Sequence, residues 1–388
     1  MGRQPAHHAA GRRRSAHVAA QHVQHLLPQV QRRRLDQLRV VVPPGRHRPI
    51  LLATPPQTPG AAVTDPILID TGRSTAGWSF WGPAFTCDRL WFLINVEQKR
   101  FVNGEALTMG SMGHTILAHY YARLACERGG FEYEGAWVDD PDHFLSPFDA
   151  VREWARLREL EGTEATPFIH TTFELFRRYL QKEPFVSDSV VAVEHQAKLT
   201  LGYSHDGDFG LWIDKNLAEA KLLDCPGLEE PVPGVPGLQH GKPVEVTKRF
   251  DLVMRHSADG RTYIWDHKVT GGSVSRKRAE QYAMDGQFAV NRILGEQLYD
   301  DFGGVVLNLV LRRDPWTVSR QFVPATPWRD AQLARQVYSK AHSLANQLVN
   351  HKRQYVTEGD WQMTQNELVC YHRYGKCGAF ELCQYGPA

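Results

Sequence analysis

The chain has 388 residues, of which 42% are hydrophobic and 23% are charged, a composition typical of a folded globular protein. It excludes collagen-like and wholly disordered classes, and no apolar run reaches the roughly 18 residues that a membrane span needs. The net charge of +2 is unevenly distributed. Residues 1–62 hold ten arginines and one acidic residue, Asp36, and carry a charge of +9, whereas the rest of the chain carries −7. Any contact with a polyanion must therefore come from a local patch.

Residues 1–62 are basic and rich in proline and show no helical or strand period, so we expect a disordered extension. An organelle transit peptide, a basic arm that binds nucleic acid, or a start codon assigned too early would each explain it. We favour the last explanation, with Val63 as the start, because the composition changes abruptly there. The expected folded part, residues 63–388, is then one domain in the cytoplasm.

From Asp65 onward the sequence has globular periodicities. Apolar residues at spacings of three and four predict helices, and His114 lies on the inward stripe of one of them with Leu117 and Tyr121. Alternation with a period of two predicts strands, and the Pro- and Gly-rich stretch 226–242 predicts an insertion loop. The order indicates a mixed α/β sheet with helices packed on it. Helices are predicted over 80–96, 105–128, 147–181, 275–299 and 328–353, and strands over 190–203, 209–214, 244–256, 261–269 and 304–312.

The most informative stretch is 249–268, in which two apolar-rich runs flank an Asp-Gly turn at 259–260. This pattern predicts a β-hairpin. A four-residue loop would place Asp251 opposite Asp266, and a two-residue loop would place it opposite Lys268. Either register puts the three side chains on one face, with opposed Cβ atoms about 5 Å apart. Two carboxylates and one ammonium group are therefore predicted to converge.

Two carboxylates this close repel each other unless a cation offsets their charge. A hard cation such as Mg²⁺ binds one or two carboxylates together with water and substrate phosphate. It would polarise a phosphodiester and activate water, while Lys268 would neutralise charge or orient the attacking water. The alternative is an ion-pair ladder on the surface of a hairpin, which the spacing alone favours about equally.

Asp251, followed by Asp266-His267-Lys268 on the next strand, resembles the PD-(D/E)XK nuclease superfamily, in particular its RecB-like and phage exonuclease branch. Residues 110–114 resemble the Gly-x-x-x-His element of that family, in which the histidine helps to bind metal. Glu194 resembles the acidic position on the strand that leads into the sheet. Further matches are Gln287, on the helix after the catalytic strand, and Asn308, on the strand that closes the core. The sequence departs from the family at Ala118, where an acid often follows the histidine, and at Asn291, where a tyrosine often follows the glutamine.

The resemblance implies a restriction-endonuclease-like fold, a mixed β-sheet core flanked by helices. It also implies roles for individual residues. The basic cluster at the start of the helix after the catalytic strand would contact phosphate, although a solvated helix turn explains it equally well. The implied catalytic residues are Asp251, Asp266 and Lys268; the implied ligands of Mg²⁺ or Mn²⁺ are His114, Asp251, Asp266 and the main-chain carbonyl of His267; the implied substrate-binding residues are Gln287, Arg276, Lys277 and Arg278.

Cysteines form a second group. Cys370, Cys377 and Cys383 lie within residues 370–383, and Cys87 is the best candidate for a fourth ligand. Four thiolates fit either zinc or an iron–sulfur cluster. Residues 87–91 resemble the Cys-Pro-Arg-x-aromatic element of the iron–sulfur nucleases in this branch, with an aspartate in place of the proline. The resemblance implies a [4Fe–4S] cluster that staples the N- and C-terminal parts of the domain together. A zinc site, for which His372 is another ligand, and ordinary reduced thiols are the alternatives.

The resemblance covers about residues 74–386 and implies a metal-dependent DNA nuclease, most simply an exonuclease of recombination, repair or phage DNA processing. The expected substrate is DNA that is single-stranded or has free ends, and no membrane partner is expected. No ATP-binding motif is visible, so unwinding would come from a helicase or recombinase partner. The alternative is a non-catalytic protein that binds nucleic acid or acts as a scaffold and retains the nuclease fold.

Overall fold

The computed structural model describes residues 65–99, 105–158, 166–182, 188–203, 209–213, 244–271, 276–312, 317–325, 327–352, 371–372 and 375–376. All of them belong to one compact unit, Leu51–Ala388. The expected disorder of residues 1–62 and the insertion loop at 226–242 lie outside the described residues, so both stay predictions. None of the helices in the described part is long and apolar enough to span a bilayer.

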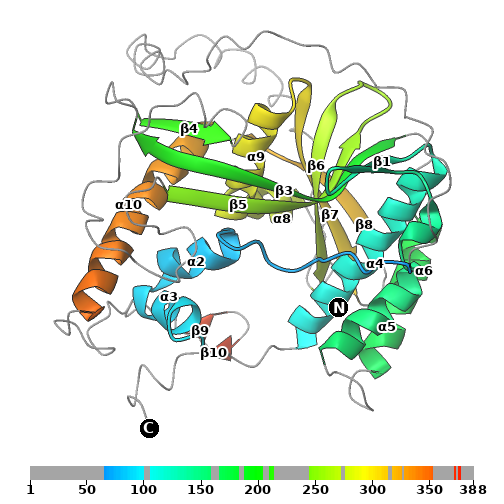
Figure 1. Cartoon of the computed structure of the whole chain (residues 1–388), viewed down its shortest axis with the longest axis horizontal. Coiled ribbons are helices and arrows are strands. Elements are labelled where there is room, and N and C mark those ends of the chain that lie inside the picture. The colour runs from blue at the N-terminus through cyan, green and yellow to red at the C-terminus, as the bar shows by residue number, and fades with distance from the viewer. Residues whose placement is uncertain are drawn as a thin grey trace, which may run out of the picture. The chain divides into compact units, whose positions relative to one another are not determined.

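A mixed six-stranded sheet lies at the centre of this unit (Figure 1), which confirms the predicted α/β class. The strand order is β4-β3-β5-β6-β7-β8, and neighbours are antiparallel except for the parallel pair β6 and β7. A parallel pair needs a crossover connection, which the two helices α8 and α9 supply here. The strands are β3 (Ser189–Tyr203), β4 (Phe209–Ile213), β5 (Val244–Arg255), β6 (Thr262–Thr270), β7 (Phe302–Leu311) and β8 (Val318–Val323).

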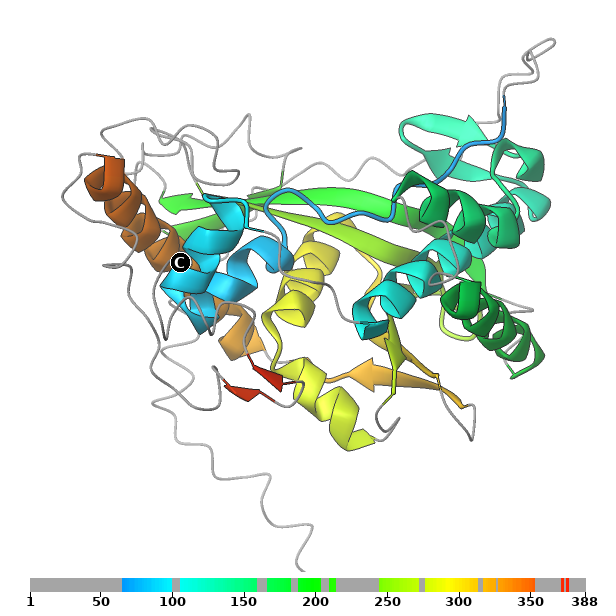
Figure 2. The ribbon, with the colours of Figure 1, turned by 90° about the horizontal axis from the view of Figure 1, so that it is seen from below.

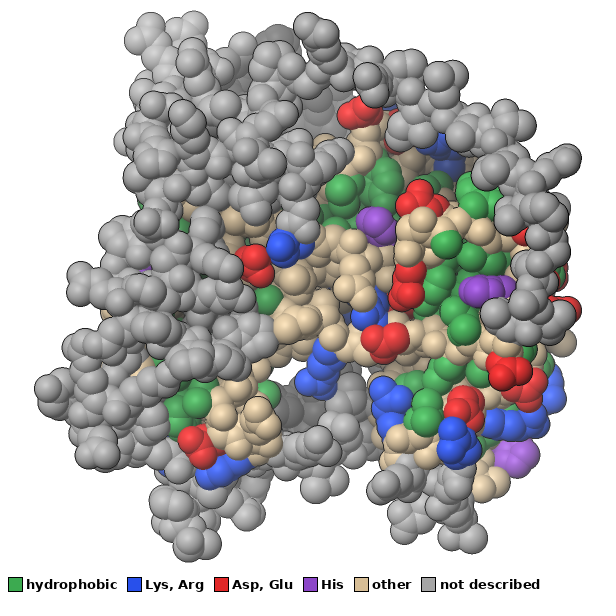
Figure 3. Space-filling model, viewed as in Figure 1, with side chains coloured by type: hydrophobic (Ala, Val, Ile, Leu, Met, Phe, Trp, Pro, Cys, Tyr) green, Lys and Arg blue, Asp and Glu red, His purple; other side chains and the backbone are tan. Residues whose placement is uncertain are grey.

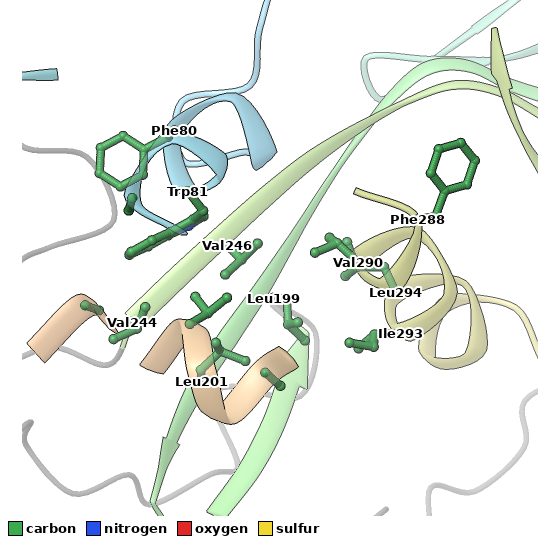
Figure 4. Close-up of a cluster of buried hydrophobic side chains, with 14 of the residues drawn as sticks. Phe80, Trp81, Leu199, Leu201, Val244, Val246, Phe288, Val290, Ile293 and Leu294 are labelled. Carbon is green, nitrogen blue, oxygen red and sulfur yellow. The ribbon is translucent and has the colours of Figure 1, made fainter. Parts of the chain in front are cut away.

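Helices cover both faces of the sheet, because alternate strand residues enter different cores. On β7, Val305 and Leu307 pack into one buried cluster and Val306 into the other. The first cluster joins the sheet to α2, α3, α9 and α10, and Figure 4 shows part of it; the second joins the sheet to α4, α5 and α6 (Figure 2). The helices are α2 (Trp78–Thr86), α3 (Asp88–Asn95), α4 (Glu105–Glu127), α5 (Pro147–Leu157), α6 (Thr166–Lys182), α8 (Arg276–Ala283), α9 (Gly286–Leu298) and α10 (Pro327–Lys352).

Three of the helix predictions were wrong in the same way, because each predicted helix is a pair. The helix predicted over 147–181 is α5 and α6, and residues 159–165 between them lie outside the described residues. The helix predicted over 80–96 breaks at Cys87, whose extended backbone (φ −163°, ψ 123°) ends α2 and precedes α3. The helix predicted over 275–299 breaks at Asp285, which accepts a hydrogen bond from the backbone N–H of Gln287 as the N-cap of α9. At Cys87 and at Asp285 the apolar period continues across the break, so periodicity alone does not reveal it.

Several short elements were not predicted. The edge strand β8 is only partly buried, and its residues lack a clear alternation of apolar and polar types. The remaining short elements also carry too few residues for a period to emerge. They are β1 (Phe131–Tyr133), β2 (Ala136–Val138), the 3₁₀ turn η1 (Pro141–His143), β9 (Tyr371–His372) and β10 (Gly375–Lys376).

The hairpin of β5 and β6 has the register of a four-residue loop. Leu252 pairs with Trp265, and Arg255 pairs with Thr262. Gly260 has a φ of 70°, which a glycine adopts without steric cost. Of the two registers that the sequence left open, the structure therefore has the one that aligns position 251 with position 266.

Asp88, at the start of α3, links this helix to the C-terminal helix α10. Its side chain is buried, forms an ion pair with Lys340 and accepts a hydrogen bond from Gln347 at 3.1 Å. Asp88, Lys340 and Gln347 thus form a polar clamp between α3 and α10. It lies next to Cys87, the predicted fourth ligand of the cysteine cluster.

We expect Asp88→Ala to lower the free energy of unfolding by about 2 kcal/mol, because Lys340 and Gln347 lose their buried partner. Chemical unfolding followed by circular dichroism measures this loss. The control is Glu174→Ala, which removes the exposed ion pair with Arg177 and should cost at most about 0.5 kcal/mol. Equal effects of the two substitutions would contradict the clamp.

Candidate functional site

A pocket of about 470 Å³ lies where β3, β5 and β6 meet α4, α9 and the segment 71–74. On the face shown in Figure 3, the acidic and basic side chains of the described residues are mixed. The pocket is different, because its walls gather carboxylates, cations and amides. Its polar lining includes His114, Glu194, Lys248, Asp251, Lys268 and Gln287.

Three of these residues form a group suited to a metal ion. His114, Glu194 and Asp251 each offer one ligand atom, and these atoms lie within 4.8 Å of one another. They come from α4, β3 and β5, and Nδ1 of His114 is 3.3 Å from Oδ2 of Asp251. One imidazole nitrogen and two carboxylates suit Mg²⁺ or Mn²⁺, which prefer hard oxygen ligands.

Glu194 reaches this group through an irregular backbone. Its φ is 49°, an uncommon value for a residue with a side chain. Its neighbours Val193 and His195 pair with Leu252 and Phe250, so Glu194 faces Asp251 across the two strands. A strained residue beside a cluster of ligands is typical of a functional site.

The pKa values of the two facing carboxylates are shifted in opposite directions. Burial raises the pKa of Asp251, but the charges of His114, Lys248 and Lys268 outweigh it and lower that pKa to about 2. Burial and the negative charge of Asp251 raise the pKa of Glu194 well above its ordinary value. A bound divalent ion would offset the repulsion between the two carboxylates and favour their ionised forms. The residues thus fit such an ion.

The second predicted acid, Asp266, has a different environment. It is 1% exposed, and its two oxygens already have partners. Oδ1 forms an ion pair with Lys268, and Oδ2 accepts a hydrogen bond of 2.6 Å from Nε2 of Gln287. Nζ of Lys248 lies 3.7 Å from the same Oδ2 atom. Asp266 is therefore neighboured by cations and is not part of the ligand group of His114, Glu194 and Asp251.

Lys268 keeps its proton in this environment. Burial lowers the pKa of its ammonium group, but the carboxylates of Asp266 and Asp251 outweigh burial and raise that pKa above its ordinary value. A charged ammonium donates hydrogen bonds and stabilises negative charge, and it has no lone pair with which to act as a base.

His267 borders the site through its main chain. Its N–H donates a hydrogen bond of 2.7 Å to Oδ2 of Asp251, which fixes the orientation of that carboxylate. Its ring is buried, stacks on Tyr121 with ring centroids 5.7 Å apart, and lies 2.9 Å from the amide nitrogen of Asn308. Burial lowers the pKa of the ring to about 4, so the imidazole is neutral. A metal role of the main-chain carbonyl stays a prediction.

The structure thus brings together His114, Asp251, Asp266, Lys268 and Gln287, as the sequence suggested. Lys277 is exposed on α8, and the side chains of Arg276 and Arg278 lie outside the described residues, so their phosphate contacts stay predictions. Cys87 is buried. The other three cysteines of the expected cluster, Cys370, Cys377 and Cys383, lie outside the described residues, and the iron–sulfur staple also stays a prediction.

Sequence reasoning assigned no role in the site to Lys248, and it noted Glu194 without assigning it as a ligand. Both carry a signal that could have been used. Lys248 interrupts a row of alternating apolar residues on β5, between Val246 and Phe250, and Glu194 interrupts an apolar run on β3. Burying a charged residue at a strand position that alternation assigns to the core costs free energy. Its presence at such a position therefore indicates a functional role.

The sequence model of the PD-(D/E)XK nuclease superfamily matches residues 84–385, which include every acid and lysine of the site. None of the curated proteins compared with the chain matches it. Nucleases of this superfamily hydrolyse their substrates and use divalent metals. The match spans more than half of the chain and agrees with the mixed sheet and with the acids and lysine gathered at the pocket. The chain therefore belongs to the PD-(D/E)XK nuclease superfamily.

Proposed function

We propose that the protein is a metal-dependent DNA nuclease that hydrolyses phosphodiester bonds in the pocket described above. One observation carries this proposal, namely that the ligand atoms of His114, Glu194 and Asp251 lie within 4.8 Å of one another in a pocket that Lys268 also lines. These three residues would hold Mg²⁺ or Mn²⁺, while Asp266 on the adjoining strand would keep Lys268 beside them. The bound ion would supply Lewis acidity and lower the pKa of a water molecule.

The protein's own residues then have separate tasks. Asp251 is oriented by the N–H of His267, and Asp266 is held by Lys268 and Gln287. Lys268 places a permanent positive charge beside these acids, where negative charge develops on the phosphate during hydrolysis. Because these partners sit on strands and helices of the core, little reorganisation is needed when the substrate arrives.

Within this class, we propose an exonuclease that acts on DNA which is single-stranded or has free ends, in recombination, repair or phage DNA processing. The support is the resemblance of Asp251, the Asp266-His267-Lys268 motif and Gln287 to the RecB-like and phage exonuclease branch. The proposal includes a helicase or recombinase partner, which would unwind the substrate because the sequence shows no ATP-binding motif, and a cytoplasmic location. Cys87 and the C-terminal cysteines support the [4Fe–4S] cluster as a second cofactor.

Asp251→Asn is expected to lower the rate of DNA cleavage at least about a hundredfold, because the substitution removes the charge that binds the ion. Glu194→Gln should also weaken the binding of Mn²⁺, measured by electron paramagnetic resonance. Cleavage is followed on gels with end-labelled single- and double-stranded DNA, with and without Mg²⁺. Asp142→Asn is the control, because that carboxylate is 82% exposed and lies outside the pocket. Full activity of Asp251→Asn would contradict the proposed site.

Purified protein is expected to be brown and to contain about four iron atoms and labile sulfide per chain, as a [4Fe–4S] cluster requires. Cys87→Ser should lower the iron content, because it removes one thiolate ligand. Cys126→Ser is the matched control, since Cys126 is also buried but has no place in the predicted cluster. Elemental analysis that finds zinc in place of iron would rule out the cluster in favour of a zinc staple.

A further inference from the structure

Lys248 is a second lysine in the site, and it belongs to neither of the motifs that identify the catalytic acids. It is 7% exposed. On β5 it follows Val244 and Val246 and precedes Phe250, all of which belong to the hydrophobic cluster beneath α2, α9 and α10. An ammonium group at such a position loses most of its hydration, which costs free energy unless other groups compensate.

The protein compensates this charge only in part. The nearest carboxylate oxygen, Oδ2 of Asp266, is 3.7 Å from Nζ of Lys248, which is longer than a hydrogen bond. That oxygen already accepts the hydrogen bond from Gln287 at 2.6 Å. An ammonium group has three N–H donors. Within the part of the chain that the structure describes, the side chain of Lys248 makes no hydrogen bond.

Lys268 provides the contrast. Its ammonium group is in direct contact with Oδ1 of Asp266, so its position is set by that ion pair. Lys248 and Lys268 both line the pocket together with Asp251 and Glu194. The two lysines therefore flank one carboxylate, but Lys268 contacts it directly, whereas Lys248 makes no side-chain hydrogen bond within the described residues. The acceptor must come from whatever occupies the pocket.

We propose that Lys248 donates hydrogen bonds to a non-bridging oxygen of the substrate phosphodiester. This inference rests on the proposed nuclease function, because it requires a phosphodiester in the pocket. Phosphate oxygens are strong acceptors, and a lysine binds them as a compact positive charge. The site then has two lysines with different tasks: Lys268 holds Asp266, and Lys248 holds the substrate.

The test compares Lys248→Met, which keeps the length of the side chain but removes its charge and donors, with Lys248→Arg, which keeps both. The probe is a fluorescein-labelled oligothymidylate, and its affinity is measured by fluorescence anisotropy at several salt concentrations. Ca²⁺ is present to neutralise the carboxylates. Lys198→Met is the matched control, because Lys198 lies on the neighbouring strand β3, pairs with Glu245 at 3.2 Å and does not line the pocket.

Lys248→Met should bind the oligonucleotide about tenfold more weakly than the wild type, as expected for loss of a hydrogen bond to a charged group. The slope of log K against log salt should fall by about 0.7, the value for one phosphate contact on a single strand. Lys248→Arg should recover most of the slope, and Lys198→Met should not change it. Because a buried charge is replaced by an apolar side chain, the unfolding temperature of Lys248→Met should be unchanged or higher.

Wild-type affinity and salt slope in Lys248→Met, combined with DNA cleavage by the wild type, would overturn this inference and leave the nuclease function intact. A lowered unfolding temperature of Lys248→Met with an unchanged salt slope would also overturn it, in favour of a structural role. A wild-type protein that neither binds nor cleaves the oligonucleotide would instead overturn the proposed function, and this inference with it.

Discussion

Charge compensation around three carboxylates is the constraint on which the site depends. Glu194, Asp251 and Asp266 come from three adjacent strands, and their charges repel one another in a region that is largely withdrawn from water. Side chains that carry positive charge lie at fixed places in the fold and offset this repulsion. Lys268 and Lys248 neighbour Asp266, and His114 neighbours Asp251, so each acid that ionises has a positive or proton-bearing partner.

The surrounding elements maintain this arrangement by packing on both faces of the sheet. Helix α4 carries His114 and packs into one core, while α9 carries Gln287 and packs into the other. The stacked rings of His267 and Tyr121 lie behind the strand that carries Asp266 and Lys268. Because these contacts are buried and continuous with the hydrophobic cores, the acids are held by rigid elements rather than by loops, as precise metal and substrate binding requires.

The sequence predicted the residues of the site better than it predicted where the helices end and begin. Asp251, Asp266 and Lys268 could be placed together because an Asp-Gly turn between two alternating runs defines a hairpin. The breaks at Cys87 and Asp285 could not be predicted from periodicity, since apolar residues continue through both. They are defined by backbone conformation at single residues, and the N-cap hydrogen bond of Asp285 is one such local event.

The amino-acid order by itself determined the hairpin and the helix that presents His114. It also determined the strand alternation that directs Asp266 and Lys268 to one face. All three are short-range consequences of side-chain period and turn chemistry. Tertiary structure alone decided that Glu194 faces Asp251, that Gln287 contacts Asp266 and that Lys248 enters the pocket. Each of these contacts joins elements that are distant in the chain, and their partners are selected by how the sheet and helices bury their apolar faces.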